Sequence, residues 1–153
     1  MNGNDILKYG HLTVLHSIDG LADGDWEAGG VCGVWSVKDI MAHLASYEHL
    51  LVDVLSGFLE GGKTPYLDQF NDQFNDVQVA ERQHLSPQGV LEEYNQTYEL
   101  AASMAARIPA EKWREPGTLP WYGAEYSLDD YVVYTFYGHK REHTAQIDHF
   151  RTG

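Results

Sequence analysis

Apolar residues recur every three or four positions in four long segments of this chain. Such spacing places the apolar side chains on one face of an α-helix. The predicted helices cover about residues 5–18, 36–60, 86–108 and 127–150, and Gly-, Pro- or Asp-containing stretches separate them. No segment sustains the alternation of apolar and polar residues that is typical of a half-buried strand. The sequence therefore predicts an all-α four-helix bundle that forms a single domain over residues 1–153.

Three of the predicted helices begin at a serine that can cap a helix N-terminus. Ser36 and Ser127 are each followed three residues later by an aspartate, which is the pattern of a capping box. Ser86 precedes Pro87, and proline is favoured in the first turn of a helix. These signals set the expected starts of the second, third and fourth helices.

Two segments between the helices carry many aromatic residues. Residues 64–85 contain a tandem Asp-Gln-Phe-Asn repeat, which places Phe70 and Phe74 four positions apart. We expect a helical arm whose aromatic side chains pack on the core, either as a kinked extension of the third helix or as a separate element. Residues 109–126 contain three prolines, two tryptophans and two tyrosines. We expect a long loop that folds back over the domain.

The composition excludes several classes of function. The formal net charge of −13 disfavours binding to nucleic acid or to acidic membrane surfaces. No apolar run approaches the roughly 20 residues that span a bilayer. The first residues do not resemble a secretory signal, so we expect a cytoplasmic protein that acts on small molecules. Cys32 is the single cysteine, and one thiol can form neither an intrachain disulfide nor a thiolate metal site.

The most specific chemical signal is a pair of histidines in the predicted fourth helix. His139 and His143 are four residues apart, which stacks their side chains about 6 Å apart on one helix face. Both imidazoles can then reach one metal ion. We expect them to point into the bundle, because they belong to the apolar stripe of this helix. That stripe consists of Leu128, Val132, Thr135, His139, His143, Gln146 and Phe150.

The predicted second helix offers a third histidine. His43 lies on the apolar face that includes Tyr47, whereas His49 falls on the opposite side, toward solvent. Burial of three imidazoles without partners would be costly, and a bound metal ion removes that cost. The alternative is that Gln146, Glu142 and buried water satisfy the histidines without a metal.

The roles of the other polar residues stay open. Glu142 could orient a ligand, act as a general base or face solvent, and Gln146 could support a ligand or fill the stripe. The remaining histidines are assigned to the surface or its edge, without a role. They are His11, His16, His84 and His149.

Two segments resemble motifs of the DinB-like superfamily. The segment Trp35-Ser36-Val37-Lys38-Asp39-Ile40-Met41-Ala42-His43-Leu44 resembles its W-S-x-x-D-x-x-x-H-L motif, and His139-Lys140-Arg141-Glu142-His143-Thr144-Ala145-Gln146-Ile147 resembles its H-x-x-x-H-x-x-Q-I motif. The resemblance implies a DinB/YfiT-like four-helix bundle with a divalent metal ion on His43, His139 and His143. Some members are transferases or isomerases that use mycothiol, bacillithiol or glutathione. Others protect against reactive small molecules, and many have no known activity.

Together these observations predict a metal-dependent enzyme that acts on a small reactive organic molecule. The expected cofactors are one divalent ion (zinc, nickel or iron) and a low-molecular-weight thiol, and both S-transfer and hydrolysis suit such a site. Tyr47 is a candidate pocket residue, and no catalytic side chain is assigned. The alternative is a non-catalytic bundle that binds or sequesters a small molecule, with a structural metal or none. Homodimerisation is a further hypothesis.

Overall fold

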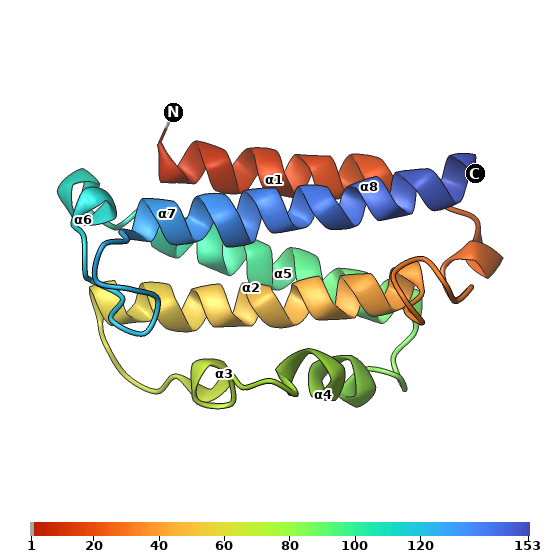
Figure 1. Ribbon diagram of the computed structural model, residues 1–153, viewed down its shortest axis with the longest axis horizontal. Coiled ribbons are helices and arrows are strands. Elements are labelled where there is room, and N and C mark those ends of the chain that lie inside the picture. The colour runs from red at the N-terminus through yellow and green to blue at the C-terminus, as the bar shows by residue number, and fades with distance from the viewer. Residues whose placement is uncertain (1) are drawn as a thin grey trace.

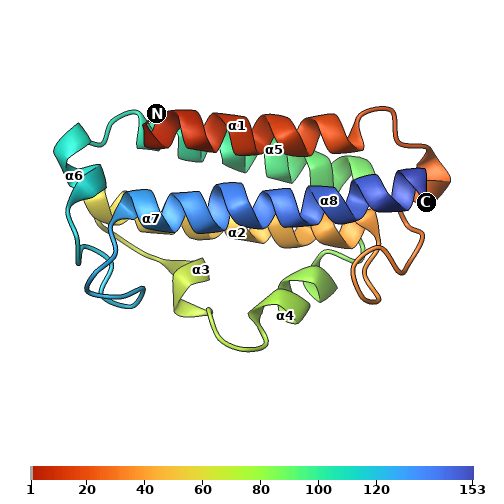
Figure 2. The same ribbon diagram turned by 45° about the horizontal axis from the view of Figure 1, so that its top comes forward.

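Four long helical segments lie side by side in the computed structural model, which describes residues 2–153 (Figures 1 and 2). They are α1 (Gly3–Ile18), α2 (Val37–Leu59), α5 (Pro87–Ala105) and a C-terminal segment built from α7 (Leu128–Val133), the π-helical turn η2 (Tyr134–Gly138) and α8 (His139–Thr152). The prediction of an all-α fold is confirmed. Between residues 2 and 153 the only β-type pairing is an isolated bridge from Cys32 to Trp35, just after the short 3-10 turn η1 (Asp23–Asp25).

The long helices do not pack equally against one another. α2 packs chiefly on α5, and α1 packs chiefly on α8, whereas α2 and α8 approach each other at few points. Figures 1 and 2 show the C-terminal segment running alongside α2 over most of its length. We call the region between α2 and the C-terminal segment the seam. It joins the α2–α5 pair to the α1–α8 pair, and it does so through side chains rather than through close approach of the backbones.

The serine caps form as the sequence predicts. Ser36 and Ser127 each accept a hydrogen bond from the backbone N–H three residues later, and the aspartate at that position accepts one from the serine N–H. The Ser86 hydroxyl oxygen accepts from the Gly89 N–H at 3.0 Å. Each such cap contributes about 1 kcal/mol to helix stability, so these serines fix where the helices of the site begin.

Two hydrophobic clusters fill the space between the long helices. Burial of each large apolar side chain contributes about 1.5–3 kcal/mol relative to its exposure to water. One cluster includes Leu7, Leu51, Leu55, Leu128 and Phe136, and the other includes Val14, Ile40, Leu44, Val90 and Ile147.

The aromatic arm forms two separate short helices rather than an extension of α5. These are α3 (Pro65–Asp68) and α4 (Phe74–Glu81), and both lie along α2 (Figure 1). The rings of Phe70 and Phe74 lie 5.1 Å apart, but Phe74 is buried and Phe70 is half exposed. The expected packing on the core is therefore confirmed for Phe74, and Phe70 stays at the edge.

This arm covers the side of α2 that the sequence assigned to solvent, and that assignment is wrong. The Asp53 carboxylate accepts hydrogen bonds from the N–H groups of Tyr66 and Leu67 at 2.8 and 3.1 Å. His49 stacks on the Tyr66 ring and lies 2.8 Å from a carboxylate oxygen of Glu93. Helical phase gives the direction of a side chain, but it cannot reveal that a later segment covers that direction.

The segment after α5 folds back over the domain, as expected. α5 ends at Ala105, about three residues earlier than the sequence predicts, and residues 110–114 form a short helix, α6 (Ala110–Arg114), that was expected to be loop. Trp113 and Leu119 are buried against the rest of the core. The aromatic loop is thus an integral part of the domain's packing.

The C-terminal segment departs from a regular α-helix at η2. The N–H of His139 donates to the carbonyl of Tyr134, five residues earlier, instead of the carbonyl of Thr135 four residues earlier. A π-helical turn of this kind rotates the residues that follow it relative to those before it. Phe136, Lys140 and Ile147 consequently form the buried centre of the segment, and the predicted stripe lies partly to one side of it.

A fully buried ion pair crosses the seam between α2 and α8. Lys140 Nζ lies 2.5 Å from Glu48 Oε1, and the two side chains are 2% and 0% exposed. The Lys140 ammonium also lies 5.1 Å from the ring centre of Tyr94. An ion pair in such surroundings is favourable only while both partners are present, because either charge alone would be buried without compensation.

His11 belongs to the same buried region, so its assignment to the surface was wrong. Its ring stacks on Tyr98 with centres 3.6 Å apart, and its Nδ1 lies 3.2 Å from the Tyr94 hydroxyl oxygen. Burial and, to a lesser degree, the charge of Lys140 lower the pKa of His11 to about 3. His11 is therefore a neutral core histidine.

Removal of one partner of the ion pair should destabilise the protein strongly. We expect Lys140→Met to lower the free energy of unfolding by about 3–5 kcal/mol, because Glu48 is left charged and buried. The double variant Glu48→Leu/Lys140→Met should recover most of that loss. Urea denaturation of the metal-free proteins measures both effects.

The matched control is Lys112→Met, which removes an exposed ion pair with Glu115. It should change the free energy of unfolding by less than about 1 kcal/mol. A similar effect of the two lysine substitutions would contradict the importance of the buried pair.

The buried His11 should make stability depend on pH. Its pKa is lower in the folded state than in the unfolded chain, so its contribution is complete above about pH 6.5 and is lost as the pH falls toward 3. Between pH 7.5 and 5 this amounts to about 2 kcal/mol. His11→Gln should reduce the measured loss by that amount in urea titrations with a chelator present, whereas His16→Gln, on the exposed side of α1, should not.

Candidate metal centre

The three histidines that the sequence predicts as metal ligands, His43, His139 and His143, lie together at the seam between α2 and α8. His139 Nε2 is 3.0 Å from His43 Nε2 and 3.0 Å from His143 Nε2. One ring nitrogen from each histidine lies within 4.8 Å of the other two. Two nitrogens bound to the same tetrahedral zinc ion are about 3.3 Å apart, given bonds of about 2.0–2.1 Å. The observed spacing therefore suits three ligands of a single ion.

Local structure explains why these side chains converge. His43 follows the Ser36 cap by about two turns, so the cap fixes its position along α2. His139 is the first residue of α8 and directly follows the π-helical turn, and His143 lies one turn later on the same face. The histidines thus come from both sides of the seam between α2 and α8, two helices that approach each other at few points.

The three imidazoles are held neutral by their surroundings. Burial, and then repulsion from His139 and His143, lowers the pKa of His43 to about 2. Burial, and then His143, lowers the pKa of His139 to about 4. Burial also lowers the pKa of His143, although the bond to Gln146 acts in the opposite direction. Neutral imidazole is the form that binds a metal ion, so the site is in its ligand form near neutral pH.

Hydrogen bonds among the histidines cannot satisfy all of these nitrogens. Each ring nitrogen carries either one proton or one lone pair, so His139 Nε2 cannot bond fully to both of its histidine neighbours. The Nδ1 atoms of His43 and His139 are buried and have no hydrogen-bond partner among the described residues. A metal ion would accept a lone pair from each Nε2 at once. The arrangement of the three histidines therefore suits coordination of one divalent ion better than it suits a hydrogen-bonded cluster.

Gln146 fixes the tautomer of one ligand. Its side-chain oxygen lies 2.8 Å from His143 Nδ1 and can only accept, so this nitrogen is the donor. The lone pair of neutral His143 then lies on Nε2, the atom that faces the other two histidines. A partner of this kind commonly orients a histidine that binds a metal. Glu142, the other candidate for such a role, is exposed.

Thr135 is a site residue that the sequence analysis placed only in the apolar stripe. Its carbonyl is not the acceptor of the His139 N–H, because that group bonds to Tyr134 in the π-helical turn. The nearby Thr135 carbonyl opposes the larger effect of burial on the pKa of His139, without a hydrogen bond to the buried Nδ1. No local sequence signal announces the π-helical turn, so this contact was not predictable.

Aromatic rings surround the histidines on the side of α2. The ring centres of Trp35 and Tyr47 lie 5.2 and 4.6 Å from that of His43, and Tyr47 also lies 5.1 Å from His139. Burial raises the pKa of the Tyr47 phenol, and Asn75 on α4 acts against that rise. The tandem repeat predicted that Phe70 and Phe74 of the arm pack on the core, but it gave no role to Asn75.

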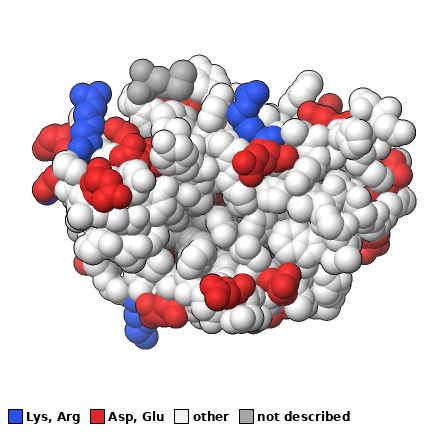
Figure 3. Space-filling view, viewed as in Figure 1, with Lys and Arg blue, Asp and Glu red and all other residues white. Residues whose placement is uncertain are grey.

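A cavity of about 280 Å³ opens beside the histidines. Tyr47 and Thr135, which both act on His139, are among its walls. On the face seen in Figure 3, charged side chains lie mainly near the edges and leave a hollowed, uncharged area between them. The walls of this cavity are thus mainly aromatic and uncharged.

The comparisons with known proteins identify the family. The sequence profile of the DinB superfamily matches residues 11–147, which include all three histidines. This chain belongs to the DinB superfamily. No curated protein and no solved structure matches it. Membership agrees with the all-helical fold, and none of the described helices is long and apolar enough to cross a membrane. That the three histidines hold an ion stays a prediction.

The contact between Gln146 and His143 can be tested through metal affinity. We expect Gln146→Leu to weaken zinc binding about 10- to 100-fold, because His143 loses the partner that holds its Nε2 lone pair toward the site. Competition with a chromophoric zinc chelator measures the affinity. Gln88→Leu, an exposed substitution on α5, is the control. Equal affinities for the two variants would show that Gln146 merely fills space.

Proposed function

We propose that this DinB superfamily protein binds one divalent metal ion through His43, His139 and His143 and uses it to act on a small reactive organic molecule. The convergence of the three Nε2 atoms supports the proposal most strongly, because that of His139 lies 3.0 Å from those of both His43 and His143. Hydrogen bonds among the three histidines cannot pair all three Nε2 atoms at once. A shared metal ion would accept the lone pair of each of them.

The number of ligands favours a catalytic site over a structural one. Among residues 2–153, no Asp, Glu or Cys joins the three histidines in the cluster. Structural zinc sites use four protein ligands, whereas catalytic sites use three. His43, His139 and His143 would hold such an ion, which would supply Lewis-acid chemistry toward a water, a thiol or a carbonyl group.

The surrounding residues would orient the substrate and exclude water. The Tyr47 phenol stays protonated because burial raises its pKa, so it can donate a hydrogen bond to a substrate beside His43 and His139. The aromatic walls would limit the access of water to that donor. Since the histidine cluster of the described chain contains no cysteine, a thiol nucleophile would come from a low-molecular-weight thiol in solution.

Thiol-dependent S-transfer or isomerisation is the reaction class we favour, and hydrolysis is the second. Three histidines suit zinc, nickel or iron(II) alike, so the ion is assigned as divalent only. A cytoplasmic location and a homodimer are parts of the same proposal.

A non-catalytic role is the competing proposal. The walls of the cavity include no carboxylate or histidine that could serve as a general base, which favours a protein that binds or sequesters an apolar compound. A metal ion would then be structural or absent. The two proposals differ in whether a small thiol or water reaches the open position of the ion.

Metal content tests the proposal directly. We expect tag-free wild-type protein to contain about one equivalent of zinc, nickel or iron by elemental analysis, and His139→Ala to contain none. A chelator should remove the ion from the wild type, and zinc should restore it. His84→Ala, which removes an exposed histidine, is the control and should retain one equivalent.

A wild-type protein that takes up neither zinc, nickel nor iron(II) would overturn the metal site. If one equivalent binds but no small thiol or carbonyl compound perturbs the spectrum of the cobalt(II)-substituted protein, the enzyme proposal fails and the sequestering role stands.

A further inference from the structure

The cavity beside the histidines has walls of one chemical kind. Eight residues line it, and none carries a charge at neutral pH. They are Tyr47, Leu50, Leu67, Phe70, Trp121, Tyr122, Tyr131 and Thr135. Five of them are aromatic and come from α2, the arm, the loop before α7 and α7 itself, so the cavity exists only in the folded domain.

The size of the cavity limits what it can hold. An apolar cavity of about 150 Å³ is known to take up benzene. A volume of about 280 Å³ is therefore sufficient for one ring or two fused rings. This volume is just below the range for complete drug-sized ligands, which is about 300–1,000 Å³.

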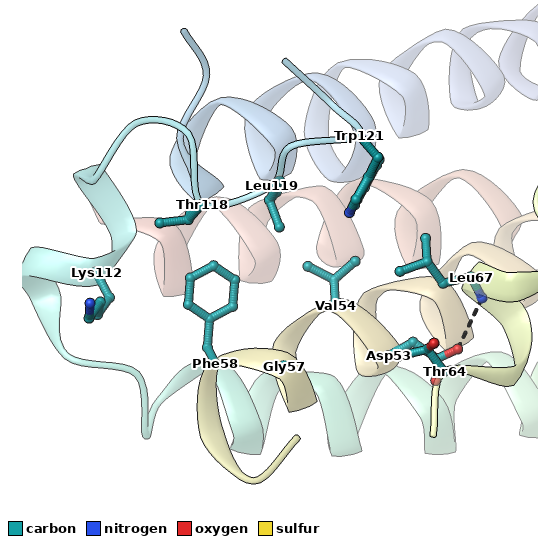
Figure 4. A pocket seen from close by; sticks show the side chains of 10 residues that line it. All are labelled: Asp53, Val54, Gly57, Phe58, Thr64, Leu67, Lys112, Thr118, Leu119 and Trp121. Carbon is teal, nitrogen blue, oxygen red and sulfur yellow. Dashed lines mark hydrogen bonds between the residues drawn. The ribbon is translucent and has the colours of Figure 1, made fainter. Parts of the chain in front are cut away.

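A second cavity adjoins the first. It has a volume of about 420 Å³ and shares Leu67 and Trp121 with the aromatic cavity. Figure 4 shows these two side chains at one end of the second cavity, while Phe58 and Lys112 lie toward the other. Leu67 and Trp121 thus separate an uncharged compartment beside the histidines from a larger one that includes Asp53 and Lys112.

Trp121 is the part of this partition that a loop supplies. It lies in the loop between α6 and α7 and is 51% exposed. Its ring meets those of Tyr131 and Tyr122, with centres 5.4 and 5.9 Å away, and helical backbone does not fix its position. Leu67, in contrast, is held by the hydrogen bond from its N–H to the Asp53 carboxylate, which is drawn in Figure 4.

We propose that the aromatic cavity binds an uncharged aromatic group of the substrate, and that Trp121 determines specificity by limiting the length of that group. A charged group would lose its hydration there without gaining a partner. Aromatic rings gain offset or edge contacts with the tyrosine and phenylalanine walls. The inference deepens the proposed function, because it assigns the substrate class of the same site.

Binding of simple neutral probes tests the cavity without knowledge of the natural substrate. The probes are 1-naphthol, which has two fused rings, 4-(benzyloxy)phenol, which is longer, and benzoate, which is charged. We expect wild-type protein to bind 1-naphthol at least tenfold more tightly than either of the other two, as measured by ligand-observed NMR titration.

Enlargement of the partition should reverse the preference for length. Trp121→Ala joins the two cavities, so 4-(benzyloxy)phenol should bind at least tenfold more tightly than it binds wild type, while 1-naphthol should bind more weakly. Leu67→Ala opens the same partition from the arm and serves if Trp121→Ala does not fold. Tyr9→Ala removes an exposed aromatic residue on α1, away from both cavities, and should change neither affinity.

The outcomes separate this inference from the metal proposal. Each titration is repeated with metal-free His139→Ala, in which neutral aromatic binding should persist, and metal content is measured independently. Protein that holds one equivalent of metal but binds benzoate as tightly as 1-naphthol overturns the inference alone. An unchanged length preference in both partition variants overturns the role of Trp121. Probe binding without metal uptake overturns the metal proposal alone.

Discussion

The buried ion pair between Glu48 and Lys140 is the interaction on which the arrangement of the site depends. α2 and α8 make few close contacts, so their relative position must come from side chains that cross the seam. A desolvated ion pair fixes the relative position of two helices, because its attraction compensates for the lost hydration only when the two charges are close and well oriented. Glu48 lies on the helix of His43, and Lys140 directly follows His139. The register that brings the two charges together therefore also brings the histidines together.

The same seam explains how so much polarity is tolerated inside a small helical protein. Lys140 is surrounded by the rings of Tyr94, Tyr98 and Phe136, whose faces attract a cation. Tyr94 in turn meets the neutral His11. In this cluster, the buried polar groups on the α1 and α5 side of the seam are in contact with one another. At the histidine cluster, in contrast, the buried Nδ1 atoms of His43 on α2 and His139 on α8 have no hydrogen-bond partner among the described residues.

The sequence predicts those features that depend on a single helix. The serine caps, the pairing of His139 with His143 and the inward direction of His43 follow from local spacing, and the family motifs select the same three histidines. Features that need a partner from elsewhere in the chain were missed. His11 and His49 were assigned to the surface or to solvent and Lys140 was given no role, yet each finds its partner on another element. The π-helical turn has no local signal, because backbone rotation at that point is set by packing.

The charge distribution gives the site a consistent chemical character. The chain carries a formal net charge of −13, and the face in Figure 3 keeps acidic side chains at its edges around an uncharged hollow. Such a field raises the local concentration of cations and opposes the approach of anions. Such a field would draw a divalent ion toward the cluster of neutral histidines, while a neutral organic molecule would meet no electrostatic barrier and would gain contacts with the aromatic walls. An anionic substrate would meet repulsion outside and lose hydration inside, so the same physical argument that favours a metal ion at the histidines disfavours a charged group in the cavity beside them.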